Sequence, residues 1–337
     1  MQLSLASLCL IGATVARSVG DSLYEAMLAK KADPSKVGYL AVYWKTAESG
    51  VFFSLSTNDD PLNFAEVNGG DPVFVPAAGT KVIRDVSIVA GGGDEAGLKW
   101  YIIGTDLNIG ATTWDKSTRT GSKGVLTYES TNLVNWTDER LVEVEGATAG
   151  MVWAPDALWD DELGAYFVTW SSKFYEESDT NHTGNSTTPL YVRAALTKDF
   201  TTYQAPATYI DNSPSDTLDQ AFMRINDTTL IRFITGGGLN GPSVEVSYDG
   251  LWGEWARPED SIAASYEGPY GWWDNKIDGK AWLLCDLVGG AAGLRGWYSG
   301  NPESGLFTRD SSSDPTYMRH GSVLAVTQEQ YDALISL

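Results

Sequence analysis

The sequence has few cysteines, few histidines and few basic residues. Only two cysteines and two histidines occur among 337 residues, and 23 Lys and Arg stand against 44 Asp and Glu. The formal net charge of −21 argues against nucleic acid or an anionic membrane as a partner, because both require a basic surface. Beyond the first sixteen residues, no apolar run approaches the length that a membrane-spanning helix needs.

The first sixteen residues, MQLSLASLCLIGATVA, form an uncharged apolar run that ends in small residues. This pattern predicts a secretory signal peptide over residues 1–16, and the run is too short for the alternative of a membrane anchor. Export agrees with four Asn-x-Ser/Thr sequons. They lie at Asn135, Asn181, Asn185 and Asn226.

The scarcity of sulfur and imidazole limits the chemistry. Cys9 would leave with the signal peptide, so Cys285 remains alone and neither a disulfide nor a cysteine zinc site can form. We interpret Cys285 as a buried apolar residue. With no cysteine nucleophile and few histidines, we expect carboxylates to carry any catalysis.

Glycine and tryptophan are plentiful, at 35 and 13 residues, which is typical of a turn-rich β protein with aromatic surfaces. One pattern recurs five times: a strand, an Asn/Asp-containing turn, and an aromatic residue that opens another strand. The marker aromatics are Phe64, Trp136, Tyr203, Trp255 and Phe307. Apolar strands such as KWYIIGTDL and AYFVTWSS lie between the copies. Helices are expected only at residues 22–31 and in the C-terminal TQEQYDALI.

Five copies of about four strands predict an all-β, five-bladed β-propeller that forms a single domain over residues 17–337. A β-sandwich is the alternative, but it would not explain five copies of one pattern. A polar residue follows each marker aromatic, just before the next apolar strand. These residues are Asp85, Asp156, Asp219, Glu267 and His320. In a propeller we expect them to enter the innermost strands at equivalent positions and to face one central pocket.

Each of these residues has a simpler interpretation when taken alone. An aspartate at a strand start is most often a turn cap, and Asp156 follows Pro155. His320 could be a satisfied interior histidine, and Trp272 and Trp273 could belong to the core. The joint pattern favours function, because carboxylates gathered in one pocket raise one another's pKa and allow one acid and one base.

At these residues the sequence resembles glycoside hydrolase family 43, whose members are inverting enzymes built on a five-bladed β-propeller. RDVSIV resembles the family's Arg-Asp-Pro stretch, with Val86 in place of the proline, and implies that Asp85 is the general base. TLDQAF implies that Asp219 orients the general acid and tunes its pKa. YEGPY matches the Glu-Gly-Pro signature and implies that Glu267 is the general acid.

Two further stretches complete the resemblance. VWAPD is similar to the second-blade signature and implies that Trp153 and Asp156 line the pocket. RHG resembles the last-blade segment, which places His320 at the axial channel near a water or a structural Ca²⁺ or Na⁺; no cofactor is required. We assign Arg319, Trp272 and Trp273 to substrate binding as well.

The resemblance implies hydrolysis by single displacement. Glu267, kept protonated by burial against aromatic residues and by its acidic neighbour, would protonate the leaving oxygen, while Asp85 activates a water on the opposite face of the sugar. This needs carboxyl groups roughly 6.5–9.5 Å apart, whereas a separation of about 5 Å would contradict inversion.

The expected substrate is a carbohydrate, an arabinose-, xylose- or galactose-containing plant polysaccharide. An exo-acting α-L-arabinofuranosidase is our first prediction, and a β-xylosidase or exo-β-galactanase is the alternative. A different class, a catalytically silent sugar-binding propeller, is favoured only by Val86 and disfavoured by three intact acids. We expect a secreted, fungal-type protein that acts as a monomer.

Overall fold

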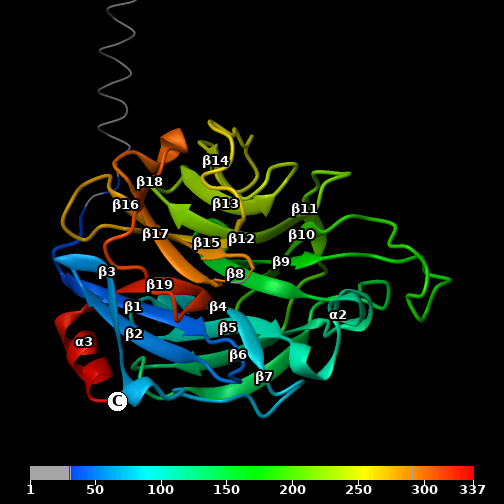
Figure 1. Cartoon of the computed structure of the whole chain (residues 1–337), viewed down its shortest axis with the longest axis horizontal. Helices are drawn as coiled ribbons and strands as arrows, with labels where there is room; N and C mark the ends of the chain where they lie inside the picture. The colour runs from blue at the N-terminus through cyan, green and yellow to red at the C-terminus, as the bar shows by residue number, and fades with distance from the viewer. Residues whose placement is uncertain (1–29, 31, 290) are drawn as a thin grey trace, which may run out of the picture.

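Five antiparallel sheets make up the part of the chain that the computed structural model describes, residues 30, 32–289 and 291–337 (Figure 1). The five innermost strands contact one another in a ring and gather at the centre of the view. The predicted all-β, five-bladed propeller is therefore confirmed. The predicted signal peptide, and all of the predicted helix at 22–31 except residue 30, lie outside the described residues.

Each sheet forms one blade, and its strands are named from the innermost outward. Blade 1 contains β19 (Arg319–Thr327), β1 (Lys36–Trp44), β2 (Phe52–Thr57) and β3 (Asp60–Glu66). Blade 2 contains β4 (Ile83–Ala90), β5 (Trp100–Asp106), β6 (Gly124–Ser130) and β7 (Thr137–Glu143). Blade 3 contains β8 (Trp153–Asp160), β9 (Ala165–Ser172), β10 (Tyr191–Thr197) and β11 (Ala207–Ile210).

The last two blades differ in strand number. Blade 4 contains β12 (Thr217–Arg224), β13 (Leu230–Gly236) and β14 (Pro242–Ser247). Blade 5 contains β15 (Tyr266–Trp273), β16 (Ala281–Leu287), β17 (Gly293–Ser299) and β18 (Thr308–Asp310). The five repeated patterns supply the outer part of each blade, as predicted. In blade 4 the outermost strand is reduced to one bridge, between Val246 and Ala256.

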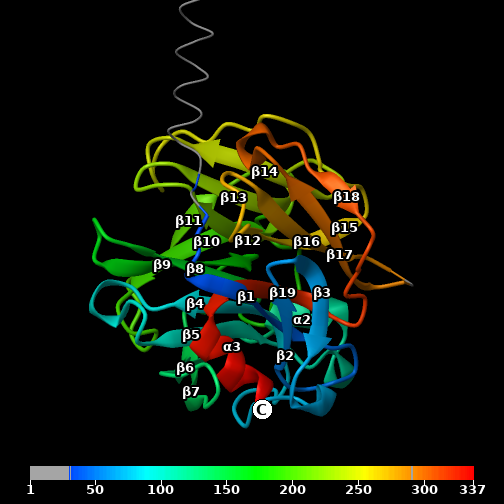
Figure 2. The same ribbon diagram turned by 90° about the vertical axis from the view of Figure 1, so that its left-hand side faces the viewer.

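Blade 1 closes the ring, because it pairs the last strand of the chain with the first. β19 runs antiparallel to β1, with Leu40 opposite Leu324. Helix α3 (Gln328–Ile335) follows directly, and a capping box between Thr327 and Gln330 starts it. It packs against β1 and β19, and Figure 2 shows it beside β1. The predicted C-terminal helix is thus confirmed.

The remaining helical segments are short. Helix α2 spans Trp114–Thr120 and was not predicted. Four 3-10 turns are present among the described residues: η1 (Asn68–Gly70), η2 (Gly93–Glu95), η3 (Ile109–Ala111) and η4 (Pro302–Ser304). In that part of the chain no helix is long and apolar enough to cross a membrane.

The core lies between neighbouring blades, where strand faces rich in aromatic and branched residues meet. Trp170, Tyr39 and Phe233 are among the largest fully buried side chains. Cys285 is also fully buried in an apolar cluster, as predicted. Because these contacts join each blade to the next around the ring, the packing fixes how the innermost strands face the axis.

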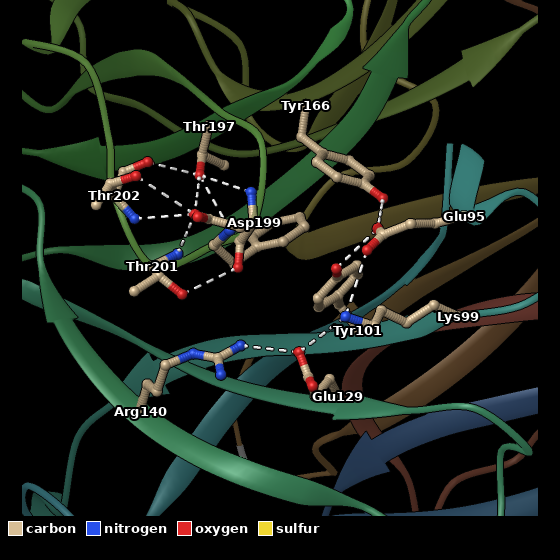
Figure 3. Close-up of polar contacts among 11 residues, drawn as sticks. Glu95, Lys99, Tyr101, Glu129, Arg140, Tyr166, Thr197, Asp199, Thr201 and Thr202 are labelled. Carbon is tan, nitrogen blue, oxygen red and sulfur yellow. Dashed lines mark hydrogen bonds and ion pairs between the residues drawn. The ribbon is translucent and has the colours of Figure 1, made fainter. Parts of the chain in front are cut away.

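Partly buried charges of blade 2, linked to blade 3 through Tyr166, form a group that we call the inter-blade cluster (Figure 3). It comprises Glu95, Lys99, Tyr101, Glu129, Arg140 and Tyr166. The Glu95 carboxylate accepts hydrogen bonds from the hydroxyl groups of Tyr101 (2.8 Å) and Tyr166 (2.9 Å). Lys99 lies 3.3 Å from both Glu95 and Glu129, and Arg140 lies 3.2 Å from Glu129. Each carboxylate therefore has a cation beside it.

The surface carries the sequon residues. Asn135, Asn181 and Asn185 are exposed, and the last two lie in the loop NHTGNSTT. Asn226 is half-buried, and its side-chain oxygen accepts hydrogen bonds from the backbone of Thr228 and Thr229.

Candidate active site

All five innermost strands contain one extra residue near their start. In each, two residues of the innermost strand lie opposite one residue of the neighbouring strand. The register of the pairing therefore shifts at the same place in every blade. Such a bulge turns the extra residue out of the ladder and re-aims its side chain. The first bulge residues are Asp85, Ala154, Asp219, Gly268 and His320.

This register corrects part of the sequence prediction. Asp85, Asp219 and His320 do occupy equivalent positions at the axis. Glu267 lies one residue before its bulge, and Asp156 lies two residues beyond Ala154. The last paired position before the bulge forms a second ring nearer the strand starts. Its members are Arg84, Trp153, Leu218, Glu267 and Arg319.

The bulges hold two of the acids in an unfavourable backbone conformation. Asp85 has φ 48° and Asp219 has φ 52°, a region that non-glycine residues seldom adopt. At the same position in blade 5, Gly268 has φ 56°, and a Cβ there would lie 2.5 Å from Cγ of His320. The glycine of Glu-Gly-Pro therefore admits the His320 ring.

Val86, the departure from the family pattern, occupies the second bulge position. In blades 3 and 5 this position is occupied by Pro155 and Pro269. Because a bulge residue lies outside the ladder register, proline is tolerated there but not required. Replacing proline by valine leaves the Asp85 bulge intact.

His320 lies between two of the acids. Its Nδ1 is 3.5 Å from Oδ1 of Asp85 and 4.0 Å from Oδ1 of Asp219. Asp219 in turn accepts a hydrogen bond of 3.0 Å from the backbone N–H of Gly268. This bond joins blade 4 to blade 5 at the residue next to Glu267, so Asp219 helps to fix the Glu267 backbone.

The surroundings separate the pKa values of Asp85 and Glu267. Burial by itself raises the pKa of Asp85, but the hydrogen bond and charge of His320, with the charge of Arg84, hold it below its ordinary value. Burial raises the pKa of Glu267 to about 7, and the charges of Asp219, Asp85 and Asp286 act in the same direction. Near neutral pH, Asp85 is ionised while Glu267 retains its proton in part.

Their neighbours are shifted as well. Burial raises the pKa of Asp219, and the charge of Asp85 contributes. Burial opposes protonation of His320, but the hydrogen bond to Asp85 and the charges of the surrounding acids raise its pKa to about 9. His320 is therefore a cation that stabilises ionised Asp85.

Asp286 belongs to the site and was missed in the sequence. It lies on β16 opposite Glu267 and is 1% exposed. Its Oδ2 accepts hydrogen bonds from Nε of Arg319 (2.7 Å) and the backbone N–H of His320 (3.1 Å), and its Oδ1 from the N–H of Gly293 (3.0 Å). The only signal was a charged residue inside the apolar run AWLLCDLVGG.

We predicted that Asp156 lines the pocket, but the structure places it elsewhere. It is 6% exposed and lies deeper along the axis, where Ser87 Oγ donates to its Oδ1 (2.6 Å) and the N–H of Phe222 donates to its Oδ2 (3.0 Å). Burial raises its pKa to about 6. Because both oxygens are satisfied by protein groups, Asp156 joins blades 2, 3 and 4 rather than contacting a sugar.

Trp272 and Trp273 are also misplaced by the prediction. They lie at the far end of β15, five and six residues beyond Glu267, or roughly 15–20 Å along a strand. Trp272 is 5% exposed and packs edge-on against Tyr39 and Phe64. Burial and neighbouring acids, rather than these indoles, therefore keep Glu267 protonated.

Trp153 and Arg319, which we assigned to substrate binding, lie at the mouth of the site in the ring that contains Glu267. Trp153 is half-buried and contacts the Trp114 ring edge-on at 6.1 Å between centroids. Arg319 pairs with Asp286 and also donates to Oγ1 of Thr46 (3.2 Å). Trp114, on α2, is 56% exposed and was not predicted to take part.

The predicted axial ion would need several ligands close to His320. Among the described residues, no group of three or more His, Cys, Asp or Glu side chains has an arrangement that could hold one. Nδ1 of His320 is already directed at Asp85. The described residues around His320 therefore do not support the predicted axial ion.

Comparison with known proteins identifies the family. The family model described as a probable glycosyl hydrolase domain, related to glycoside hydrolase family 43, matches residues 34–332. The chain belongs to this family. The resemblance drawn from the sequence motifs is therefore confirmed, and it covers nearly all of the described propeller.

Individual glycosyl hydrolases are similar over parts of the chain. An α-L-arabinofuranosidase of Bifidobacterium longum subsp. longum is 32% identical over 192 residues, which are 53% of this chain and 18% of that protein. A β-1,3-galactosidase of family 43, solved with galactodeoxynojirimycin, superposes with a TM-score of 0.50 at 12% identity, over 74% of this chain and 81% of its own. An exo-β-1,3-galactanase from Phanerochaete chrysosporium gives 0.47 at 16% identity, over 72% and 51%. At 12% identity, the likeness to the galactosidase shows the fold alone.

Proposed function

We propose that the protein is an inverting glycoside hydrolase that releases terminal α-L-arabinofuranosyl residues from plant cell-wall polysaccharides. The observation that carries this proposal is the electrostatic contrast within one axial site. Asp85 has a lowered pKa, and Glu267 has a pKa raised to about 7. Two carboxyl groups with opposed protonation states are the arrangement that acid–base glycoside hydrolysis requires.

In this mechanism Glu267 protonates the glycosidic oxygen as the bond to the sugar breaks. Asp85 accepts a proton from the water that attacks the opposite face of the sugar. Asp219 positions the Glu267 backbone through Gly268 and, when ionised, raises the pKa of the acid. His320 holds Asp85 in its ionised form.

The choice of sugar rests on the partial identity with the Bifidobacterium arabinofuranosidase. The three acids and the intact Asp85 bulge favour an enzyme over a silent sugar-binding propeller, since binding alone has no need of a shared proton. The acid-base pair also fixes the expected pH dependence. The turnover number should fall as pH rises through about 7, because Glu267 then loses its proton.

The decisive experiment is hydrolysis of arabinofuranosides, xylosides and galactosides with the product anomers followed by NMR. We expect release of arabinose, with the first-formed anomer opposite in configuration to the substrate. A first-formed product of retained configuration would contradict the roles of Asp85 and Glu267. Preference for xylosides or galactosides would reassign the substrate and leave these roles in place.

A further inference from the structure

Five side chains form a continuous arc at the mouth of the site, which we call the mouth arc: Arg319, Trp44, Arg84, Trp114 and Trp153. The guanidinium carbon of Arg319 lies 4.9 Å from the Trp44 ring centroid, and that of Arg84 lies 4.0 Å from the same ring. Arg84 also lies 5.3 Å from Trp114, which contacts Trp153. Two cations and three indoles thus lie in contact with one another beside Asp85 and Glu267.

The cations at the mouth differ in how their charge is balanced. Arg319 pairs with Asp286 at 2.7 Å, and His320 pairs with Asp85 at 3.5 Å. Arg84 makes no side-chain hydrogen bond or ion pair with any described residue, and its Nε is buried without a hydrogen-bond partner. The charge of Arg84 acts on neighbouring Asp85, whose pKa it lowers, but no described carboxylate lies within the 4.0 Å of an ion pair with its guanidinium.

A second donor beside Arg84 also lacks a partner. Nε1 of Trp44 is buried without a hydrogen bond to a described residue, although Trp44 itself is 5% exposed. Buried N–H groups without partners are unfavourable, so a ligand whose binding turned these side chains toward an acceptor group would stabilise this corner of the mouth. Stacking on Trp44 and Trp114 meanwhile restrains the guanidinium, which lowers the entropy lost when a ligand binds.

We propose that Arg84 binds the carboxylate of a uronic acid residue carried by the polysaccharide beside the sugar that is released. A planar guanidinium matches a carboxylate in a bidentate pair, and the exposed face of Trp114 suits a sugar ring. This proposal rests on the proposed function. It makes the enzyme selective for acidic side-chain polysaccharides over neutral ones.

The test measures binding without turnover. Glu267→Gln protein is titrated with a glucuronic-acid-bearing arabinoxylan oligosaccharide and with the same oligosaccharide after carboxyl reduction, by calorimetry. We expect the acidic form to bind about tenfold or more tightly, and the difference to shrink with added salt. Equal affinities would overturn the proposal. Because no hydrolysis is involved, a failure of the arabinofuranosidase assignment leaves this comparison readable.

Three variants in the Glu267→Gln background locate the effect. Arg84→Gln should abolish the preference for the acidic ligand, and Arg84→Lys should retain part of it because the charge remains. Trp114→Ala should weaken both ligands alike. Lys276→Gln, which removes an exposed cation paired with Asp59, is the matched control and should change nothing. A preference that survives Arg84→Gln would refute the assignment of Arg84.

Discussion

The inter-blade cluster contains two carboxylates, Glu95 and Glu129, and two cations, Lys99 and Arg140 (Figure 3). The axial site places Asp85, Asp219, Glu267 and Asp286 around His320 and Arg319. The first group pairs every acid with a cation and also uses two tyrosine hydroxyls. In the second, acids outnumber the cations in contact with them, so not all of the acids are ionised together, and Glu267 keeps a proton more readily than Asp85.

This difference separates two uses of buried charge. In the inter-blade cluster, charges that are paired with opposite charges hold the elements in place. The unbalanced acids at the axis repel one another, and this repulsion keeps a proton on Glu267. The repulsion lowers the stability of the fold, and the unfavourable backbone conformations of Asp85 and Asp219 lower it further. Packing in the surrounding blades must offset both. The following variants test the contrast, from the largest expected effect to the smallest.

Glu267→Gln should lower the turnover number by roughly 10²–10⁴-fold, because a general acid contributes about this factor. The loss should be smaller for an aryl glycoside with a good leaving group, which needs less protonation. Stopped assays with natural and aryl arabinofuranosides measure both. Full activity on the natural substrate would remove Glu267 from the mechanism.

Asp156→Asn should change how stability depends on pH. The pKa of Asp156 is raised from 3.8 to about 6, so its contribution to stability is complete below about pH 4 and is lost as pH rises through about 6. Relative to wild type, the free energy of unfolding of the variant should therefore rise by up to about 3 kcal/mol between pH 4 and pH 7. Urea titrations at several pH values measure this; parallel curves for the two proteins would contradict it.

Glu95→Gln in the inter-blade cluster should lower stability and leave activity unchanged, whereas the main effect of Glu267→Gln should be on activity. It weakens the ion pair with Lys99 and the hydrogen bonds from two tyrosines, so the free energy of unfolding should fall by about 1–3 kcal/mol. The turnover number should be unchanged, since Glu95 lies outside the axial site. A loss of activity without a loss of stability would break the comparison between the two regions.

Asp219→Asn should shift the alkaline limb of the pH–rate profile to lower pH by roughly one unit. The charge of Asp219 raises the pKa of Glu267, so removing that charge lets Glu267 lose its proton earlier. Asp227→Asn, which removes an exposed acid outside the axial site, is the matched control. If both variants kept the wild-type profile, Asp219 would have no role in tuning the acid.

The sequence was sufficient to predict the five blades because each copy carries its own turn residues and marker aromatic. It also placed Asp85, Asp219 and His320 correctly, since these residues begin innermost strands. It wrongly assigned Glu267 and Asp156 to the same position in their strands, because the position of a bulge cannot be read from the spacing of residues in the sequence. Asp286 escaped notice because it approaches the axis from the second strand of its blade.

The assignments of Trp272 and Trp273 to the site failed for a geometric reason. In YEGPYGWW the two indoles are close to Glu267 in sequence, but an extended strand carries them to the opposite end of the channel. Trp44 and Trp114, by contrast, reach the mouth from a neighbouring blade and from a loop helix. Proximity of this kind depends on the tertiary arrangement and leaves no local pattern to read.

Ring closure by β19 has a consequence for when the enzyme can work. β19 is the last propeller strand in chain order, and it delivers both Arg319 and His320 to a centre whose other members come from blades 2, 4 and 5. Before it docks against β1, Asp85 and Asp286 have no cation from that strand beside them. The proposed catalysis therefore requires a closed ring: a chain in which β19 is unpaired, or one cut before residue 319, lacks both of these cations.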